Sequence, residues 1–137
     1  MSSPATITIE TSPGDSLTDV TDRVRAIVRD GGVRDGLCCV VVPHTTAAIT
    51  VNSALDPATL TDIVADLRRL VPTRTDFHHV ADTPSDAAGH IKASLIGHSQ
   101  TLVIADGDLV LGASQSVLLF DFDGPRERRV LVKIIEG

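Results

Sequence analysis

The first third of the chain combines an alternating apolar pattern with a helical one. Isoleucines alternate with polar residues across residues 5–11, which predicts a half-exposed strand. Apolar residues then recur at helical spacing over residues 17–28, so a helix is expected there. Ser16 is placed to cap this helix, and the pair Gly31-Gly32 is placed to end it.

The middle of the chain is predicted to contain two strands and a long helix. Residues 37–42 are all apolar, a run typical of a strand that is buried on both faces. A second strand is expected over residues 45–51. Asp56 and Pro57 then supply an N-cap followed by proline at the first helical position, and Pro72 ends the helix.

The last part of the chain is predicted to hold a loop, a short helix and a run of strands. Residues 73–84 form the loop, and residues 85–96 form a helix that Ser85 or Asp86 caps and Gly97 ends. Asp106-Gly107 separates two β-rich runs, which is typical of a hairpin. Because the elements cluster instead of alternating, we predict an α+β fold with mostly antiparallel sheets. The strands are expected at residues 101–104, 109–111, 116–122 and 130–135.

The composition agrees with a single globular domain over residues 1–137. Hydrophobic residues make up 42% of the chain, enough for one core. The formal net charge is −6, and an acidic chain lacks the basic face that binds phosphate backbones, which argues against nucleic acid as a partner. The start of the chain has no signal-peptide pattern, and no apolar run approaches the ~20 residues of a membrane helix. We therefore expect a cytoplasmic protein without membrane contact.

Histidine gives the strongest chemical signal in this sequence. Three imidazoles that converge with one open position would form a zinc site for hydrolytic or Lewis-acid chemistry. Asp82 and Asp86 are placed to hydrogen-bond the outer ring nitrogens of such ligands. The spacing does not match a compact metal signature, and on spacing alone histidines in surface loops are the better interpretation. The five histidines are His44, His78, His79, His90 and His98.

A second candidate site is the charged turn DFDGPRERR at residues 121–129. The planar guanidinium groups of Arg126 and Arg129 suit a phosphate or carboxylate, because each can bind two oxygens together. Lys92 and Ser94 on the expected short helix are further candidates for an anion site. The alternative interpretation is a solvated turn with local Arg–Asp pairs. We find no legible nucleophile–base pair in the sequence.

Three separated segments carry a recognisable sequence. They are HTTAAITVN at residues 44–52, GHIKASLIG at residues 89–97 and FDGPRERRV at residues 122–130. A pattern of aliphatic residues and glycines that includes Gln115 spans residues 99–117. In this order the segments resemble the YjbQ-like family, whose members are often described as secondary thiamin-phosphate synthases.

The resemblance implies a compact two-sheet β-sandwich with flanking helices, assembled as a homotrimer. It also implies a divalent metal ion near the subunit interface, and imidazole ligands suit zinc. His79 is favoured over His78 because it lies eleven residues before His90, as in the family. The implied metal ligands are His44, His79 and His90, and these are also the predicted catalytic residues together with Asp82, where the family usually has a glutamate. The predicted contacts to a phosphorylated substrate are Thr45, Asn52, Lys92, Ser94, Gln115, Arg126 and Arg129.

The activity implied by the resemblance is that of a thiamin-phosphate synthase. Such an enzyme would join hydroxymethylpyrimidine diphosphate to thiazole phosphate and release pyrophosphate. The chain departs from the family at Ser53, where a glutamate is usual, and at Ser114, where a tryptophan is usual. These losses favour an alternative, a non-catalytic trimer that binds a metal or a small anion. The retained histidines favour chemistry instead, which includes metal-dependent hydrolysis of a small phosphorylated metabolite.

Overall fold

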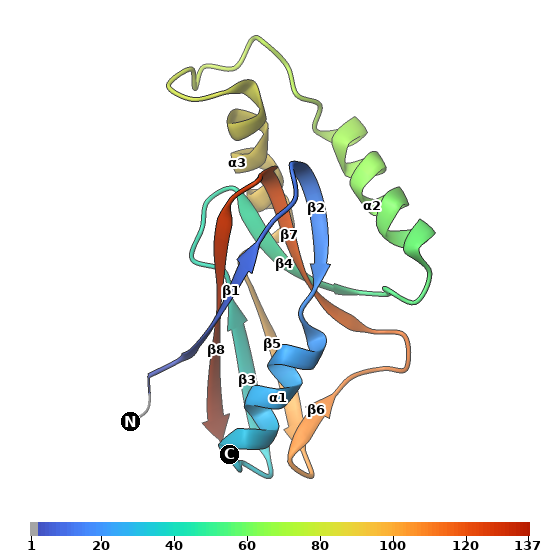
Figure 1. Ribbon diagram of the computed structural model, residues 1–137, viewed down its shortest axis with the longest axis vertical. Helices are drawn as coiled ribbons and strands as arrows, with labels where there is room; N and C mark the ends of the chain where they lie inside the picture. The colour runs from blue at the N-terminus through green and yellow to red at the C-terminus, as the bar shows by residue number, and fades with distance from the viewer. Residues whose placement is uncertain (1–2) are drawn as a thin grey trace.

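The described part of the chain forms two antiparallel β-sheets flanked by three helices, which confirms the predicted α+β sandwich. A computed structural model describes residues 3–137. The larger sheet, sheet A, has the strand order β1-β8-β3-β5-β6, and the smaller one, sheet B, has the order β2-β7-β4 (Figure 1). None of the helices described over this range is long and apolar enough to cross a membrane. The strands are β1 (Ala5–Glu10), β2 (Gly14–Asp19), β3 (Gly36–Val41), β4 (Ala47–Asn52), β5 (Ser99–Ala105), β6 (Asp108–Val110), β7 (Ser116–Gly124) and β8 (Glu127–Glu136). The helices are α1 (Thr21–Gly31), α2 (Pro57–Leu70) and α3 (Pro84–Ile96).

Sheet B is the middle layer of the molecule. Successive side chains of its central strand β7 point to opposite faces of the sheet. Val117 and Leu119 join a core with α1 and the inner face of sheet A, whereas Phe120 and Phe122 join a second core with α2 and α3. Because both faces of β7 are covered, every residue from Val117 to Phe122 is buried.

The strand that the apolar run at residues 37–42 predicts to be buried on both faces is covered on one face only. Cys38 and Val40 point into the core and are fully buried, but Leu37 is 41% exposed on the outer face of sheet A. The helices pack elsewhere, α1 on the inner face of sheet A and α2 and α3 on sheet B. Within the single chain the prediction is therefore wrong for β3, and the burial it describes occurs in β7.

Residues 14–19 form a strand where the start of a helix was expected. β2 pairs with β7, with Leu17 opposite Phe120, and α1 begins only at Thr21. The prediction that Ser16 caps a helix is wrong for the same reason. Pairing with the central strand of sheet B outweighs the helical spacing of apolar residues, because local propensity is weak beside tertiary packing.

The two helices near the upper end in Figure 1 begin where local signals place them. Asp56 caps α2 by accepting a hydrogen bond from the N–H of Ala58 at 2.9 Å, and Pro57 opens the first turn. Thr83 caps α3 through its side chain, so the expected cap at Ser85 or Asp86 is wrong, whereas Gly97 ends that helix as predicted. The segment between α2 and α3 arches over the outer end of α3 (Figure 1). Loop side chains are thereby placed beside the first turns of α3.

Candidate metal centre on helix α3

The first two turns of α3 and the loop before them carry two histidines and a carboxylate, the His–Asp–His cluster (His79, Asp86 and His90). Asp86 Oδ2 lies 3.0 Å from His79 Nε2 and 3.2 Å from His90 Nε2. One possible ligand atom from each residue lies within 4.8 Å of the other two. The imidazole rings meet edge to face with their centroids 5.2 Å apart. Three donor atoms therefore converge on one point.

Helix geometry explains this convergence. Asp86 and His90 are four residues apart on α3, so their side chains lie on one face, one turn apart. His79 comes from the loop that arches over the same turn. The Asp86 side chain is 8% exposed, whereas those of His79 and His90 are 43% and 41% exposed. The cluster therefore has a buried carboxylate at its base and imidazoles that reach solvent.

The neighbours of Asp86 keep its carboxylate ionised. Burial is the largest single influence and raises the pKa of Asp86, but hydrogen bonds and positive charge from His79 and His90 together outweigh it. The net result is a pKa below the usual value for aspartate. One carboxylate and two imidazoles form a donor set that suits zinc and other first-row divalent ions.

His44 lies outside the cluster. Its Nε2 accepts a hydrogen bond from the backbone N–H of Arg129 at 2.9 Å. Burial lowers the pKa of His44, and the positive charges of Arg128 and Arg129 lower it further. The structure thus brings together two of the three predicted histidine ligands and places the third across a hollow from His90.

Two depressions share His90 as a common wall. The first, the polar hollow, has a volume of about 440 Å³ and lies between α3 and the loop that joins β3 to β4. The second, the Phe77 groove, has a volume of about 690 Å³ and lies between α3 and the loop before it. Both volumes fall within the roughly 300–1,000 Å³ typical of small-molecule sites. The polar hollow is lined by His44, Thr45, His90, Ser94 and His98, among others.

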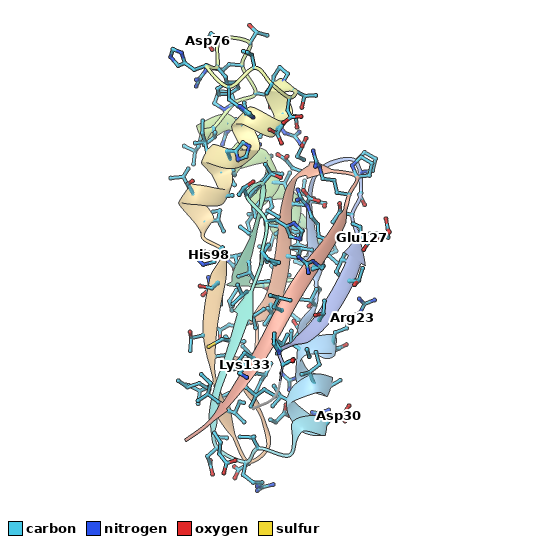
Figure 2. All side chains as sticks on the ribbon, turned by 90° about the vertical axis from the view of Figure 1, so that its left-hand side faces the viewer. Arg23, Asp30, Asp76, His98, Glu127 and Lys133 are labelled. Atoms are coloured by element: carbon cyan, nitrogen blue, oxygen red, sulfur yellow. The ribbon has the colours of Figure 1, made fainter. Side chains whose placement is uncertain are left out.

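Two of the labelled side chains in Figure 2 mark the extent of this region along the long axis of the molecule. Asp76 lies at the tip of the loop above α3, and His98 lies just beyond the other end of that helix (Figure 2). Asp76 lines the Phe77 groove, whereas His98 lines the polar hollow. The two depressions therefore follow α3 on either side of His90.

Several other predicted site residues lie near the cluster. Thr45 and Ser94 line the polar hollow, and the Ser94 hydroxyl donates to the backbone carbonyl of His90 at 3.0 Å. Asp82 Oδ2 is 3.9 Å from His79 Nε2, farther than Asp86, and its side chain is 62% exposed. Arg126 Nη2 lies 3.9 Å from Asp86 Oδ1 and is bonded to Asp123 at 2.7 Å.

The remaining predicted residues have other surroundings. Lys92 is buried, where its ammonium donates to Asp15 Oδ2 at 2.7 Å. Asn52 ends β4, and its side-chain oxygen accepts from the N–H of Ser53. Gln115 accepts from Gly112 in the turn before β7. Asn52 pairs with Ser116 at one end of sheet B, whereas Ala47, which lines the polar hollow, is at the other end of β4. The structure therefore brings neither Asn52 nor Gln115 to the cluster.

A buried ion pair lies close to His44 in the β7–β8 hairpin. Arg128 donates to the two carboxylate oxygens of Asp121 at 3.0 and 2.8 Å, and the two side chains are 4% and 0% exposed. Thr11 and the backbone N–H of Asp123 also donate to Asp121, and Arg128 donates to Thr46 Oγ1 at 2.8 Å. Burial raises the pKa of Asp121, but these hydrogen bonds outweigh it and lower the pKa below its usual value. This arginine of the charged turn therefore stabilises the fold internally.

Asp86 lies within hydrogen-bond distance of two histidine ring nitrogens, as the sequence predicted. The same Asp86 oxygen is also a possible metal ligand beside His79 and His90, a role that the sequence analysis did not assign to it. The usable signal was its spacing. A carboxylate and a histidine four residues apart on a helix present adjacent ligands, just as two histidines at that spacing do.

The fold and the cluster define an α+β protein with two antiparallel sheets and a candidate metal centre on its third helix. The chain belongs to the family described as UPF0047 protein YjbQ-like, whose model matches residues 5–137. It is 42% identical over 127 residues to a UPF0047 protein of Methanocaldococcus jannaschii, covering 93% of this chain and 90% of the relative. It is 33% identical over 132 residues to the UPF0047 protein YugU of Bacillus subtilis, covering 95% of this chain and 97% of the relative. The crystal structure of a YbjQ-like protein of unknown function from Sulfolobus solfataricus is similar with a TM-score of 0.92 at 30% identity, covering 98% of this chain and 96% of that one.

These comparisons confirm the family and correct the expected activity. The relatives carry only the UPF0047 family designation, and the Sulfolobus structure is described as that of a protein of unknown function. None of these descriptions indicates a thiamin-phosphate synthase. The expectation of that activity is therefore wrong, although the family resemblance that suggested it is right.

Proposed function

We propose that the protein binds one divalent metal ion, preferably zinc, at the His–Asp–His cluster, and that the bound ion holds a small anion. The convergence of three donor atoms carries the proposal: both imidazole nitrogens lie 3.0–3.2 Å from the same oxygen of Asp86. Donor atoms of a tetrahedral zinc site with Zn–N distances of about 2.0–2.1 Å lie roughly 3.3 Å apart. Both distances to Asp86 are already close to this value, and all three donor atoms lie within 4.8 Å of one another.

The charges around the cluster favour an anionic ligand. A divalent ion with one carboxylate and two neutral imidazoles keeps one unit of net positive charge. Arg126 adds a guanidinium 3.9 Å from Asp86, although Asp123 partly neutralises it. When bound, the metal would supply Lewis acidity, and the residues would orient the anion. His44 remains a predicted ligand and Asp82 a predicted partner of His79.

Asp86→Asn is expected to weaken zinc binding by more than about a hundredfold, beyond the 10–100-fold typical of losing an outer hydrogen-bond partner. The amide keeps the shape of the side chain but removes the charge at the base of the cluster. The measurement is competitive titration of metal-free protein with zinc and a chromogenic chelator. The wild type is expected to bind one zinc ion per chain.

Two variants serve as controls for this measurement. Asp82→Asn removes an exposed carboxylate that lies farther from His79, so zinc affinity is expected to change by less than about tenfold. His44→Ala tests the remaining predicted ligand, and a loss as large as that of Asp86→Asn would assign His44 to the metal. Wild-type protein that takes up no zinc, nickel, cobalt or iron would contradict the proposal.

We also propose that the protein is a cytoplasmic homotrimer. Support comes from an apolar row on the outer face of sheet A, where Leu37 lies opposite both Ile135 and Val103, and Val103 lies opposite Val110. These four side chains are 41–53% exposed in the single chain. A contiguous exposed apolar face marks a surface that another protein covers. Three copies is the number that the family resemblance implies.

Val103→Lys is expected to dissociate the assembly. A lysine in the centre of the apolar row would bring a charge into the contact and leave it without a partner. Sedimentation velocity would then show a monomer, whereas Asp62→Lys, an exposed change on α2, would keep the wild-type mass. A monomeric wild type would contradict the assembly without bearing on the metal centre.

A further inference from the structure

We propose that the anion held at the His–Asp–His cluster carries a compact apolar group, and that this group lies in the Phe77 groove. The inference rests on the metal site of the proposed function and names the class of ligand that the site would take. The ligand would be an organic oxyanion, a phosphate, phosphonate or carboxylate, with an aryl or similarly sized hydrocarbon body.

The groove and the cluster share their walls. His79 and His90 line the groove and also supply two of the three donor atoms of the cluster. An anion on the free side of the bound metal therefore has the groove directly beside it. The volume of about 690 Å³ exceeds what an inorganic anion fills. It suits a small organic molecule, since such sites span roughly 300–1,000 Å³.

The part of the groove wall that α3 and Phe77 form is apolar, although Arg74, Asp76 and His78 also line the groove. Ala87 and Ile91 are four residues apart on α3 and present methyl groups on the face next to His90. Phe77 faces them from the loop. The guanidinium of Arg74 lies 4.4 Å from the centroid of the Phe77 ring and is itself bonded to Asp76 at 2.8 Å. This stacking orients the ring, because a cation over an aromatic face is attracted to it.

The polar hollow on the other side of His90 does not offer the same surface. Imidazoles of His44 and His98 and the hydroxyls of Thr45 and Ser94 line it together with Ala47, Ala93 and Gly97, and no phenylalanine does. Its volume of about 440 Å³ is also smaller than the 690 Å³ or so of the Phe77 groove. The hydrocarbon part of the ligand is therefore assigned to the Phe77 groove, and the polar hollow is left to water or to polar substituents.

The test compares two phosphonates that share a head group and differ in their body. Zinc-loaded protein is titrated with methylphosphonate and with phenylphosphonate by isothermal titration calorimetry. We expect phenylphosphonate to bind at least about tenfold more tightly, because burying an aromatic ring removes much more apolar surface from water. Phe77→Ala is expected to abolish this preference and to leave the affinity for zinc and for methylphosphonate unchanged.

Leu95→Ala is the matched control, since Leu95 is an apolar residue of α3 that is 63% exposed and does not line the groove. It is expected to keep the preference for phenylphosphonate. Equal affinities for the two phosphonates in zinc-loaded wild type would overturn the inference and leave the metal site standing. A preference that survives Phe77→Ala would overturn the assignment to the groove. Failure to bind zinc at all would instead overturn the proposed function, and this inference with it.

Discussion

Replacing Arg128 by methionine is expected to lower the free energy of unfolding by about 3–5 kcal/mol at neutral pH, the range for breaking one partner of a buried ion pair. Asp121 is fully buried and loses two hydrogen bonds in the variant, at 3.0 and 2.8 Å in the wild type. Thr11 and the N–H of Asp123 remain, but neither carries a charge. Urea denaturation, monitored by circular dichroism, measures the difference in the free energy of unfolding between the variant and the wild type.

The effect of Arg128→Met is expected to shrink as the pH falls. In the wild type the pKa of Asp121 lies below its unfolded value of about 3.9, so this group contributes stability above that pH and loses it as the pH falls through the folded pKa. Without Arg128, burial dominates and the pKa rises above the unfolded value. The variant then gains relative stability as Asp121 becomes protonated. The stability difference is therefore largest at pH 7 and smaller at pH 4.

Two comparisons isolate the buried charge. Arg129→Met changes the adjacent, exposed arginine, and a shift within about 0.5 kcal/mol is expected because surface substitutions rarely do more. Asp121→Leu combined with Arg128→Met removes both charges and is expected to recover much of the loss. A single Arg128→Met variant that is as stable as the wild type would show that the pair is dispensable.

Local sequence signals predicted those parts of the fold that short-range physics determines. Asp56 and Pro57 begin α2, and both Asp106 and Gly107 adopt the positive φ of a tight hairpin turn. β2 was missed because its existence depends on pairing with β7, which lies a hundred residues farther along the chain. The exposure of Leu37 was missed because an apolar run does not say which faces its own chain will cover.

The candidate site divides in the same way. His79 and His90 could be chosen from the sequence, but the part played by Asp86 depends on how the preceding loop folds over α3. Lys92 looked available for an anion, yet it points beneath α3 to Asp15. The position of Lys92 on its helix could not reveal this contact, because Asp15 lies on β2, early in the chain. Contacts between distant segments decide which polar side chains remain free for a ligand.

Phe122→Ala is expected to lower the free energy of unfolding by about 3–5 kcal/mol, the usual range for truncating a buried phenylalanine. Phe122 is fully buried against Phe120, with ring centroids 4.4 Å apart, and its Cβ lies close to Gly89 at the point where α3 crosses sheet B. The cavity would therefore open directly beneath the helix that carries Asp86 and His90. Urea denaturation measures the loss, and hydrogen exchange of the α3 amides locates it.

Phe77→Ala provides the matched comparison, because it is the same substitution on a half-buried loop residue and is expected to cost less than about 1 kcal/mol. Comparing the two variants then distinguishes a residue that supports the site from a residue that contacts its ligand. Phe122→Ala is expected to speed exchange in α3 and to weaken zinc binding, since Asp86 and His90 would no longer be held in register with His79. Phe77→Ala is expected to leave both unchanged. If Phe122→Ala left α3 exchange and zinc affinity at wild-type values, the packing of α3 on sheet B would not be what positions the cluster.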